Sequence, residues 1–454
     1  MATSTVFPRR TFVLCALACA ATVYGAPLEP GMELTLKHAI EVALQNHPAR
    51  LAAASREQAA HERVGEARAN LLPAVSAVSE YLRSTDNGIG DTAYLGVPGI
   101  ARAPTTGRHV NQLTDTFDNY LGGISAYQYL FDFGRTRGLV EQRNAEADAA
   151  AARAELVDLD LVFDVSAAYF DLLAAKEIVK VFDTAVSQRE QHLEDARVKS
   201  RMGLRPEIDA FTAEAELARA KLHLVDARNA VATAKATLDN AMGLGDGAPE
   251  YRQVDPLAYR EVDRTLPDLL RTALEHRPDL KMLEDEARAT GAEIKEYRSD
   301  YFPNLGAAAG YSVRGQNERP GNNFYAGVVV TWPLFSGFLT DHEVAEARLR
   351  QDAIRHDLED VRQRTVLQVK RSFFEWQASV ERIRKAQQTL AASRVEVELA
   401  QKRYETGLGN IIELTDAQRR FTEDQAAEVQ ARVAFSVAEA ELARDTGTGT
   451  GPGH

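Results

Sequence analysis

The histidine and acidic side chains are the groups in this sequence best able to do catalytic or metal chemistry, but their spacing favours neither. His61-Glu62 begins like a zinc-protease motif, yet no second histidine follows one helical turn later. His47 stands before Pro48, a pair more typical of a turn than of a metal site. The sequence also lacks a Gly-x-Ser-x-Gly elbow and a phosphate-binding glycine loop. We therefore expect no catalytic residues, no cofactor and no metal.

The N-terminal segment has the features of an export signal. Arg9 and Arg10 precede a short apolar stretch, Phe12 to Ala21, and small residues follow. Because this stretch is too short to span a bilayer, residues 1–26 are predicted to be a cleaved signal peptide.

Three details of this segment stay open. Cleavage after Ala20, Gly25 or Ala26 would fit equally well, and the paired arginines favour an ordinary signal, with a twin-arginine signal as the alternative. Lipidation of Cys19 is an alternative, although an alanine stands where the lipid-attachment motif usually has leucine. If cleavage removes both cysteines, the mature chain can form neither a disulfide nor a thiolate metal site.

The chain is acidic, with a formal net charge of −13. Arg9 and Arg10 are the only charged side chains before residue 27, so loss of the signal would leave −15. An acidic exported chain is not expected to bind nucleic acid, and any pore that it lined would favour cations. No apolar run of about 20 residues follows the signal, which excludes a helical membrane protein. A soluble periplasmic protein and a β-barrel both remain.

The sequence contains an internal duplication. His47-Pro48 recurs as Arg277-Pro278, 230 residues later, and Gly203-Leu204 recurs as Gly407-Leu408, 204 residues later. One insertion of 26 residues in the first copy, within the polar and glycine-rich stretch 84–116, accounts for both offsets. Such constant offsets indicate duplication of a whole structural unit.

Each copy is predicted to contain a short helix, a longer helix, two strands, a very long helix and a returning helix. The copies cover residues 27–242 and 265–444, joined by a linker at 243–264 and followed by a disordered tail at 445–454. The predicted strands cover about 73–83 and 117–131, then about 303–314 and 323–335. The predicted long helices cover about 137–201 and 207–242, then about 338–405 and 411–444.

The strand after Pro303 alternates cleanly. Odd positions from Leu305 to Val313 are apolar, whereas the positions between them are mostly polar or small. This period is what a barrel strand needs with lipid outside and water inside; an amphipathic sheet in a soluble protein is the alternative. Aromatic clusters at 127–133 and 332–338 suit a membrane-interface girdle, or hydrophobic packing where a strand meets a helix.

The long helices carry a heptad seam. Val366, Val369, Phe373, Trp376, Val380 and Ile383 are spaced by three and four residues in turn. The first copy repeats the seam with Val162, Val165, Tyr169 and Leu172, then Lys176. The pattern predicts coiled-coil packing, and about 65 residues at roughly 1.5 Å each give a length on the order of 100 Å. A tube across a compartment needs that length, whereas a compact domain does not.

Four strands per chain predict a shared barrel. An open sheet edge in lipid leaves unpaired backbone groups, and four strands cannot close on themselves. Two chains would give about eight strands, a barrel filled by its own side chains. Three chains would give twelve strands and room for a channel, so a trimer is predicted.

These features resemble the TolC family of outer-membrane efflux and secretion channels. The resemblance rests on the duplicated Asn-His-Pro and His-Arg-Pro turns, the Leu-Leu-Pro and Tyr-Phe-Pro strand starts, Trp-Pro-Leu-Phe-Ser-Gly-Phe at 332–338 and the two Gly-Leu turns. It covers about Leu34 to Leu442. It implies an α+β, mainly α fold: a trimeric 12-stranded outer-membrane β-barrel with four strands per chain, continued by a long periplasmic α-helical coiled-coil barrel, with the linker in an equatorial collar.

The resemblance also implies function and partners. It implies an outer-membrane channel subunit of a tripartite efflux pump or type I secretion system, passively conducting substrates across the periplasm and outer membrane. The implied partners of this homotrimer are a periplasmic adaptor (membrane fusion) protein, an inner-membrane pump or ABC exporter, and outer-membrane lipid. Gly203-Leu204 and Gly407-Leu408 would form the tips where the adaptor docks, although glycine is also a routine helix cap.

Further roles at the channel entrance follow from the same resemblance. Glu413 and Asp416, three residues apart and on one helix face, would form an acidic ring; a solvated helix face is the alternative. Tyr404 and Asp209 occupy two positions of the family's entrance latch. The arginine position of that latch is Gly409, so we expect an incomplete latch and a looser closed state.

A periplasmic coiled-coil adaptor or scaffold protein is the rival interpretation. It would share the signal and the heptads, but it would not need duplicated strand pairs flanked by aromatic residues. The sequence does not indicate whether the cargo is a drug, a metal or a protein, because in such systems the pump sets the specificity.

Overall fold

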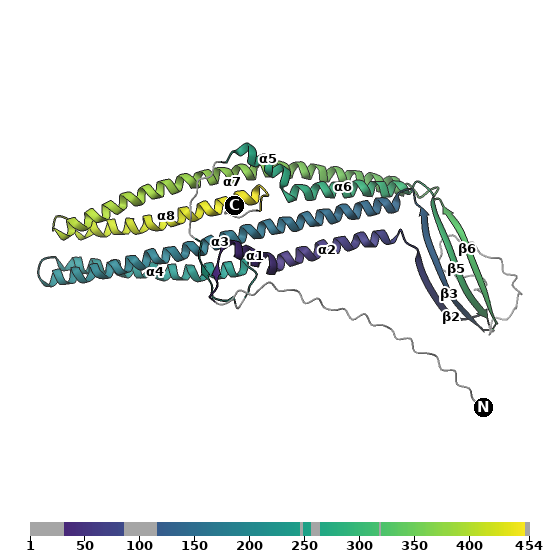
Figure 1. Ribbon diagram of the computed structural model, residues 1–454, viewed down its shortest axis with the longest axis horizontal. Coiled ribbons are helices and arrows are strands. Elements are labelled where there is room, and N and C mark those ends of the chain that lie inside the picture. The colour runs from purple at the N-terminus through teal and green to yellow at the C-terminus, as the bar shows by residue number, and fades with distance from the viewer. Residues whose placement is uncertain (1–30, 86–115, 246–247, 256–263, 317–318, 450–454) are drawn as a thin grey trace, which may run out of the picture.

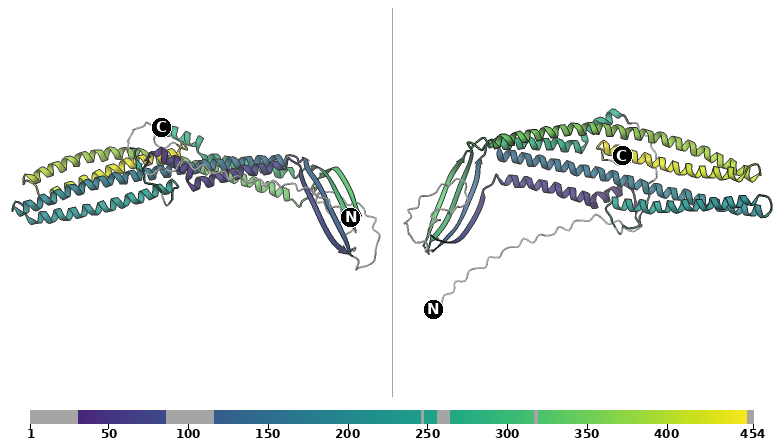
Figure 2. Two further views of the ribbon diagram at one scale, coloured as in Figure 1. Left: turned by 60° about the horizontal axis from the view of Figure 1, so that its bottom comes forward. Right: turned by 180° about the vertical axis from the view of Figure 1, so that it is seen from behind.

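The computed structural model describes residues 31–85, 116–245, 248–255, 264–316 and 319–449. The predicted signal peptide, Cys19 and most of the stretch 84–116 lie outside these residues. The molecule is elongated and mainly helical (Figure 1), with a β-sheet at one end and two helical hairpins that reach the other end. The two views of Figure 2 show that the hairpins run side by side.

One antiparallel sheet contains a strand pair from each copy. The strands are β2 (Ala74–Thr85), β3 (Thr116–Phe131), β5 (Asn304–Gln316) and β6 (Arg319–Thr331), in the order β2-β3-β5-β6. The prediction that the last strand continues to residue 335 is wrong: β6 ends at Thr331, two residues before Pro333, which has no N–H to donate. Within the described chain, β2 and β6 each pair on one side only, so the sheet has two open edges.

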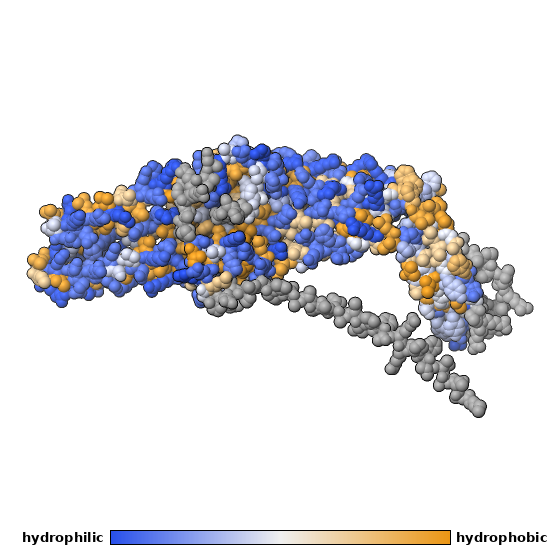
Figure 3. Space-filling model, viewed as in Figure 1, coloured by the Kyte–Doolittle hydropathy of each residue, from blue (hydrophilic) through white to orange (hydrophobic). Residues whose placement is uncertain are grey.

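Strand register gathers the apolar side chains on one face of the sheet. Tyr311 of β5 lies between Ile124 of β3 and Phe324 of β6, and all three are exposed. The alternation predicted for β5 therefore extends across the sheet, even though β6 by itself alternates less clearly. Figure 3 shows hydrophobic surface at the junction of the sheet with the helices and on the adjoining part of the sheet, whereas most of the visible helical surface is hydrophilic.

The opposite face of the sheet is small and polar, with tyrosine rings lying over glycines. A Cβ atom at Gly306 would lie 2.4 Å from the hydroxyl oxygen of Tyr127, and one at Gly310 would lie 2.6 Å from that of Tyr325. The glycines are therefore required so that the rings can lie flat against the sheet.

Two hairpins of unequal helices form the rest of the length. The first pairs α3 (Arg135–Arg201) with α4 (Glu207–Ala241), and the second pairs α7 (Leu339–Glu405) with α8 (Ile411–Asp445). α3 and α7 have 67 residues each, which gives about 100 Å at 1.5 Å per residue. Trp376, Val380 and Ile383 of the predicted seam are buried against α8.

Shorter helices continue each returning helix toward the sheet. These are α1 (Leu36–Asn46) and α2 (Pro48–Ala69) in the first copy, and α5 (Leu266–His276) and α6 (Pro278–Ser299) in the second. The end of α4 abuts the start of α2, since a Cβ at Gly243 would lie 2.7 Å from the Cα of His47. The end of α8 meets the start of α6 in the same way, since a Cβ at Gly447 would lie 3.2 Å from the Cα of Arg277. Both glycines have positive φ. The two copies of the sequence therefore have the same arrangement of helices.

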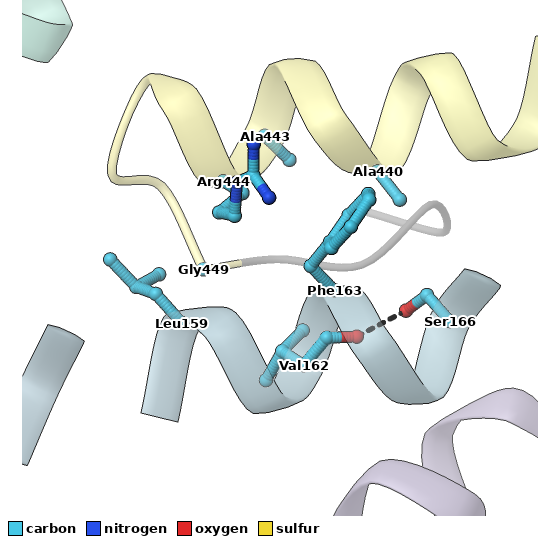
Figure 4. A pocket seen from close by; sticks show the side chains of 8 residues that line it. All are labelled: Leu159, Val162, Phe163, Ser166, Ala440, Ala443, Arg444 and Gly449. Carbon is cyan, nitrogen blue, oxygen red and sulfur yellow. Dashed lines mark hydrogen bonds between the residues drawn. The ribbon is translucent and has the colours of Figure 1, made fainter. Parts of the chain in front are cut away.

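The predicted disordered tail starts too early. Asp445 belongs to α8, and Thr446 is 2% exposed, with its hydroxyl donating to the carbonyl of Leu442 at 2.8 Å. Figure 4 shows that the chain then passes Leu159 of α3, where Gly449 lies. Residues 446–447 are the repeat counterparts of 242–243 and end the second copy as those end the first; residues 450–454 lie outside the described chain.

The described part of the linker packs at the waist of the molecule. Its strand β4 (Arg252–Gln253) pairs in parallel with β1 (Glu33–Leu34). Tyr169 of α3 is fully buried there, and its hydroxyl lies 2.9 Å from both the Leu34 carbonyl and the Asp255 carboxylate. Burial and the neighbouring carboxylate raise the pKa of Tyr169, so the ring stays neutral. This core fixes the N-terminal segment and the linker to the long helix.

Candidate functional site

Two helical turns form the tip of the molecule farthest from the sheet (Figure 1). In the first, Gly203 has a φ of +70°; its N–H donates to Ser200, and the N–H of Leu204 donates to Lys199. In the second, Gly407 has a φ of +81°. Left-handed glycine with these hydrogen bonds is a standard helix C-terminus, and it explains why both copies keep the glycine.

Both turns present the same pair of apolar side chains to solvent. Leu204 and Leu408 are 70% and 77% exposed, and Ile208 and Ile412 stand four residues beyond them at 64% and 63%. The isoleucines are also 204 residues apart, so they are repeat equivalents. Sequence reasoning singled out the Gly-Leu turns but missed these isoleucines, although the repeat alignment contains them.

The two predicted latch residues lie together. Tyr404 and Asp209 are buried, at 3% and 6% exposure, and the Tyr404 hydroxyl donates to the Asp209 carboxylate at 3.4 Å. Burial and the negative charge of Asp209 raise the pKa of Tyr404, so its hydroxyl keeps the proton that it donates. The contact joins α4 to the end of α7 and therefore one hairpin to the other.

An arginine that sequence reasoning missed also joins the hairpins. Arg205 follows the first Gly-Leu turn, and its guanidinium donates to the backbone carbonyl of Tyr404 at 2.6 Å and to that of Gly409 at 3.5 Å. The same guanidinium lies 4.6 Å from the centre of the Tyr404 ring. The latch position itself, residue 409, is glycine, and the arginine at this tip comes from the first turn instead.

The two predicted entrance acids are part-exposed and paired. Glu413 lies 2.9 Å from the guanidinium of Arg403, and Asp416 lies 3.6 Å from that of Arg419. Arg419 also contacts Glu423 at 3.0 Å. Each acid thus has a nearby counter-charge: Arg403 lies on the other helix of the hairpin, and Arg419 lies three residues beyond Asp416 on the same helix.

Aromatic side chains collect where the sheet meets the helices. Phe133 stacks on Phe302 with ring centres 5.0 Å apart, and Phe335 contacts Phe338 edge-on at 5.6 Å. All four are exposed. Phe133 and Phe338 adopt positive φ, a conformation that bulky residues rarely take, so these turns hold the rings in place at some cost in backbone strain.

The described residues contain no group of three or more histidine, cysteine, aspartate or glutamate side chains placed to hold a metal ion. Among the described helices, none combines the length and the apolar character needed to cross a membrane.

Comparison with known proteins decides the family. The family described as "Outer membrane efflux protein" matches residues 39–244 and 269–448, which are most of both copies. The chain belongs to the outer membrane efflux protein family. The predicted resemblance to TolC-like proteins is thereby confirmed, and so is an outer-membrane channel used in efflux or type I secretion, with a periplasmic helical extension.

Individual relatives support this membership. The chain is 27% identical over 440 residues to Protein CyaE of Bordetella pertussis, covering 92% of this chain and 87% of that one. It is 25% identical over 417 residues to Alkaline protease secretion protein AprF of Pseudomonas aeruginosa, covering 86% and 80%. The CmeC outer membrane channel of Campylobacter jejuni has the same fold, with a TM-score of 0.76 at 14% identity, covering 100% and 95%. The family is one of transport channels, which leaves the rival adaptor interpretation without support.

Proposed function

We propose that three copies of this chain form one conduit: a twelve-stranded barrel in the outer membrane, continued by a helical tube through the periplasm. The observation that carries the proposal is the open four-stranded sheet with an exposed apolar face. An edge strand in lipid has no water to satisfy its N–H and C=O groups, so β2 of one copy must pair with β6 of another. Three copies give the smallest such barrel with room for a channel.

A helix face without a partner supports the same assembly. On α4, Phe211, Ala215, Ala218, Leu222 and Val225 follow heptad spacing and are all exposed, on the face away from α3. We call these five residues the α4 seam. On α7, Ala392, Val395 and Leu399 form a similar exposed row at the same distance from the tip. A neighbouring copy would bring the two rows together as a coiled coil.

The test of the assembly is the mass of the purified protein. Native mass spectrometry in detergent should give a trimer, and site-specific cross-linking should join β2 to β6 of different chains. A monomer that conducts ions in planar bilayers would overturn the proposal.

The tips are proposed to dock a periplasmic adaptor, which in turn recruits an inner-membrane pump or ABC exporter. Leu204 and Leu408 are the most exposed large apolar side chains near the turns, and such side chains at a helical tip suit contact with a partner. The double variant Leu204→Asp/Leu408→Asp should assemble normally but lose cross-linking to the adaptor in cells. Ala230→Asp, which adds a carboxylate at an exposed position away from the tip, is the control. Equal cross-linking of both variants would contradict the docking role.

Glu413 and Asp416 are proposed to line the entrance as a ring of six carboxylates. Arg403 and Arg419 lie beside them, so the ring should favour cations only modestly. In planar bilayers, Glu413→Ala/Asp416→Ala should shift the reversal potential toward anion preference, because the arginines remain. An unchanged reversal potential would show that the two acids do not line the permeation path.

A further inference from the structure

We propose that Arg205 is the residue that holds the two hairpins of each chain together at the tip and so keeps the channel entrance closed. The inference rests on the proposed conduit and deepens it by naming a residue that sets its resting state. It replaces the expectation that the missing arginine at position 409 leaves the entrance loosely closed.

The geometry of Arg205 is that of a helix cap supplied from a neighbouring hairpin. α7 ends at Glu405, and the carbonyl of Tyr404 belongs to its last turn. That carbonyl accepts the N–H of Gly407 at 3.2 Å and the guanidinium of Arg205 at 2.6 Å. A fixed positive charge at this end of a helix is favourable because the last carbonyls carry partial negative charge.

The ring of Tyr404 supplies a second attachment. The guanidinium of Arg205 lies 4.6 Å from the ring centre, within the range of cation–π attraction, whereas the ammonium group of Lys199 is farther away at 5.5 Å. The Tyr404 ring is also held by the hydrogen bond that its hydroxyl donates to the Asp209 carboxylate. Arg205, Tyr404 and Asp209 thus form one network across the two hairpins.

Comparison of contact lengths identifies the stronger link. The contact from Tyr404 to Asp209 is 3.4 Å long, beyond the usual O–H···O range of about 2.5–3.0 Å. The bond from Arg205 to the Tyr404 carbonyl is 0.8 Å shorter and has a cationic donor. Removing Arg205 should therefore loosen the tip more than removing the tyrosine hydroxyl.

The duplication explains where this arginine stands. Arg205 and Gly409 are repeat equivalents, each being the second residue after the tip glycine. A Cβ at Gly409 would lie 3.1–3.2 Å from Arg403 and from the carboxylate of Glu413, so that turn has little room for a side chain. The first turn carries the arginine instead and extends it to the second turn.

The experiment compares closed-state lifetimes of the assembled wild-type protein and variants in planar bilayers. Arg205→Ala should raise the ratio of open to closed time at least about tenfold, the factor equivalent to about 1.4 kcal/mol. Arg205→Lys should fall between, because it keeps the charge but loses the planar group. Tyr404→Phe, which keeps the ring and the carbonyl, should change the ratio less than Arg205→Ala.

Arg201→Ala is the matched control. Arg201 carries the same charge at the same tip, but it bonds within its own helix, to Arg197 and Glu194. Wild-type behaviour of Arg201→Ala beside an opened Arg205→Ala supports the proposal. Equal effects of the two variants, or none from Arg205→Ala, overturn it.

Two measurements keep these outcomes separate from other failures. The mass and melting temperature of Arg205→Ala should match those of the wild type, which shows that an altered lifetime does not come from unfolding. If the wild-type protein itself forms no channel, the proposed conduit fails. If the wild type gates and Arg205→Ala gates identically, only the role of Arg205 fails.

Discussion

Replacement of Leu222 by aspartate should break the assembly while leaving the single chain folded. Leu222 is the fourth residue of the α4 seam and is 60% exposed in one chain, so its own chain gains little from it. In the proposed trimer the seam packs against α7 of a neighbour, and the aspartate would be buried there without a partner. Ala230→Asp adds the same charge to the same helix at an exposed position outside the seam.

The size of the effect follows from burial. Complete burial of a leucine side chain contributes about 1.5–3 kcal/mol, so covering the remaining 60% of Leu222 contributes about 1–2 kcal/mol per interface. An unpaired buried carboxylate adds a penalty of a few kcal/mol more. About 3 kcal/mol at each of three interfaces gives about 9 kcal/mol, or about six orders of magnitude in the association constant.

Native mass spectrometry of the three proteins in detergent measures this directly. The wild type and Ala230→Asp should be trimers, and Leu222→Asp should be mainly monomer with unchanged helix content by circular dichroism. A Leu222→Asp trimer as abundant and as heat-resistant as that of Ala230→Asp would refute the packing of the α4 seam against a neighbour.

Three further outcomes are expected. Gly310→Ala should destabilise the sheet by about 1–3 kcal/mol, because the new Cβ would press on the Tyr325 ring. Gly327→Ala should not destabilise it, because a Cβ there meets nothing within 4 Å. The stability of both variants is measured as the temperature at which the protein shifts from its folded to its unfolded gel mobility. Tyr169→Phe should lower the free energy of unfolding by about 1–3 kcal/mol, since buried acceptors lose their donor; thermal denaturation checks this. The raised pKa of Tyr404 means that its bond is complete below the ordinary tyrosine pKa of about 10 and is lost only above it. Closed-state lifetimes should therefore not fall as pH approaches 10 in the wild type, and a fall absent from Tyr404→Phe would contradict this.

The sequence predicts the parts of the fold that follow from chain periodicity. Leu305 to Val313 alternate because one face of the sheet is apolar, and Val380 and Ile383 fall in a heptad because α7 packs on α8. Prolines and glycines at equivalent places in both copies mark the turns. These signals are local, so they can be recognised without knowledge of contacts between distant segments.

Periodicity does not show the contacts between different helices. The charge partner of Glu413 is on the other helix of its hairpin, and Arg205 reaches the turn 204 residues away. The tail was misjudged for a similar reason: Thr446 and Gly447 are small residues in a glycine-rich stretch, but they end the second copy as residues 242–243 end the first. Carrying the end of the first copy, residue 242, forward by the 204-residue offset gives residue 446 as the end of the second copy.

Positions that are identical in both copies reflect the backbone conformation, whereas positions that differ reflect the role of the side chain. Gly203 and Gly407 both remain, because each ends a long helix in the left-handed conformation. Arg205, by contrast, has glycine as its counterpart, because a Cβ at Gly409 would lie only 3.1–3.2 Å from Arg403 and from the carboxylate of Glu413. In the proposed trimer, six turns would therefore share one backbone shape but alternate in chemistry, with a cationic turn beside a turn that accepts it. An entrance of this kind can be closed within each chain, so its closure should not require contacts between chains.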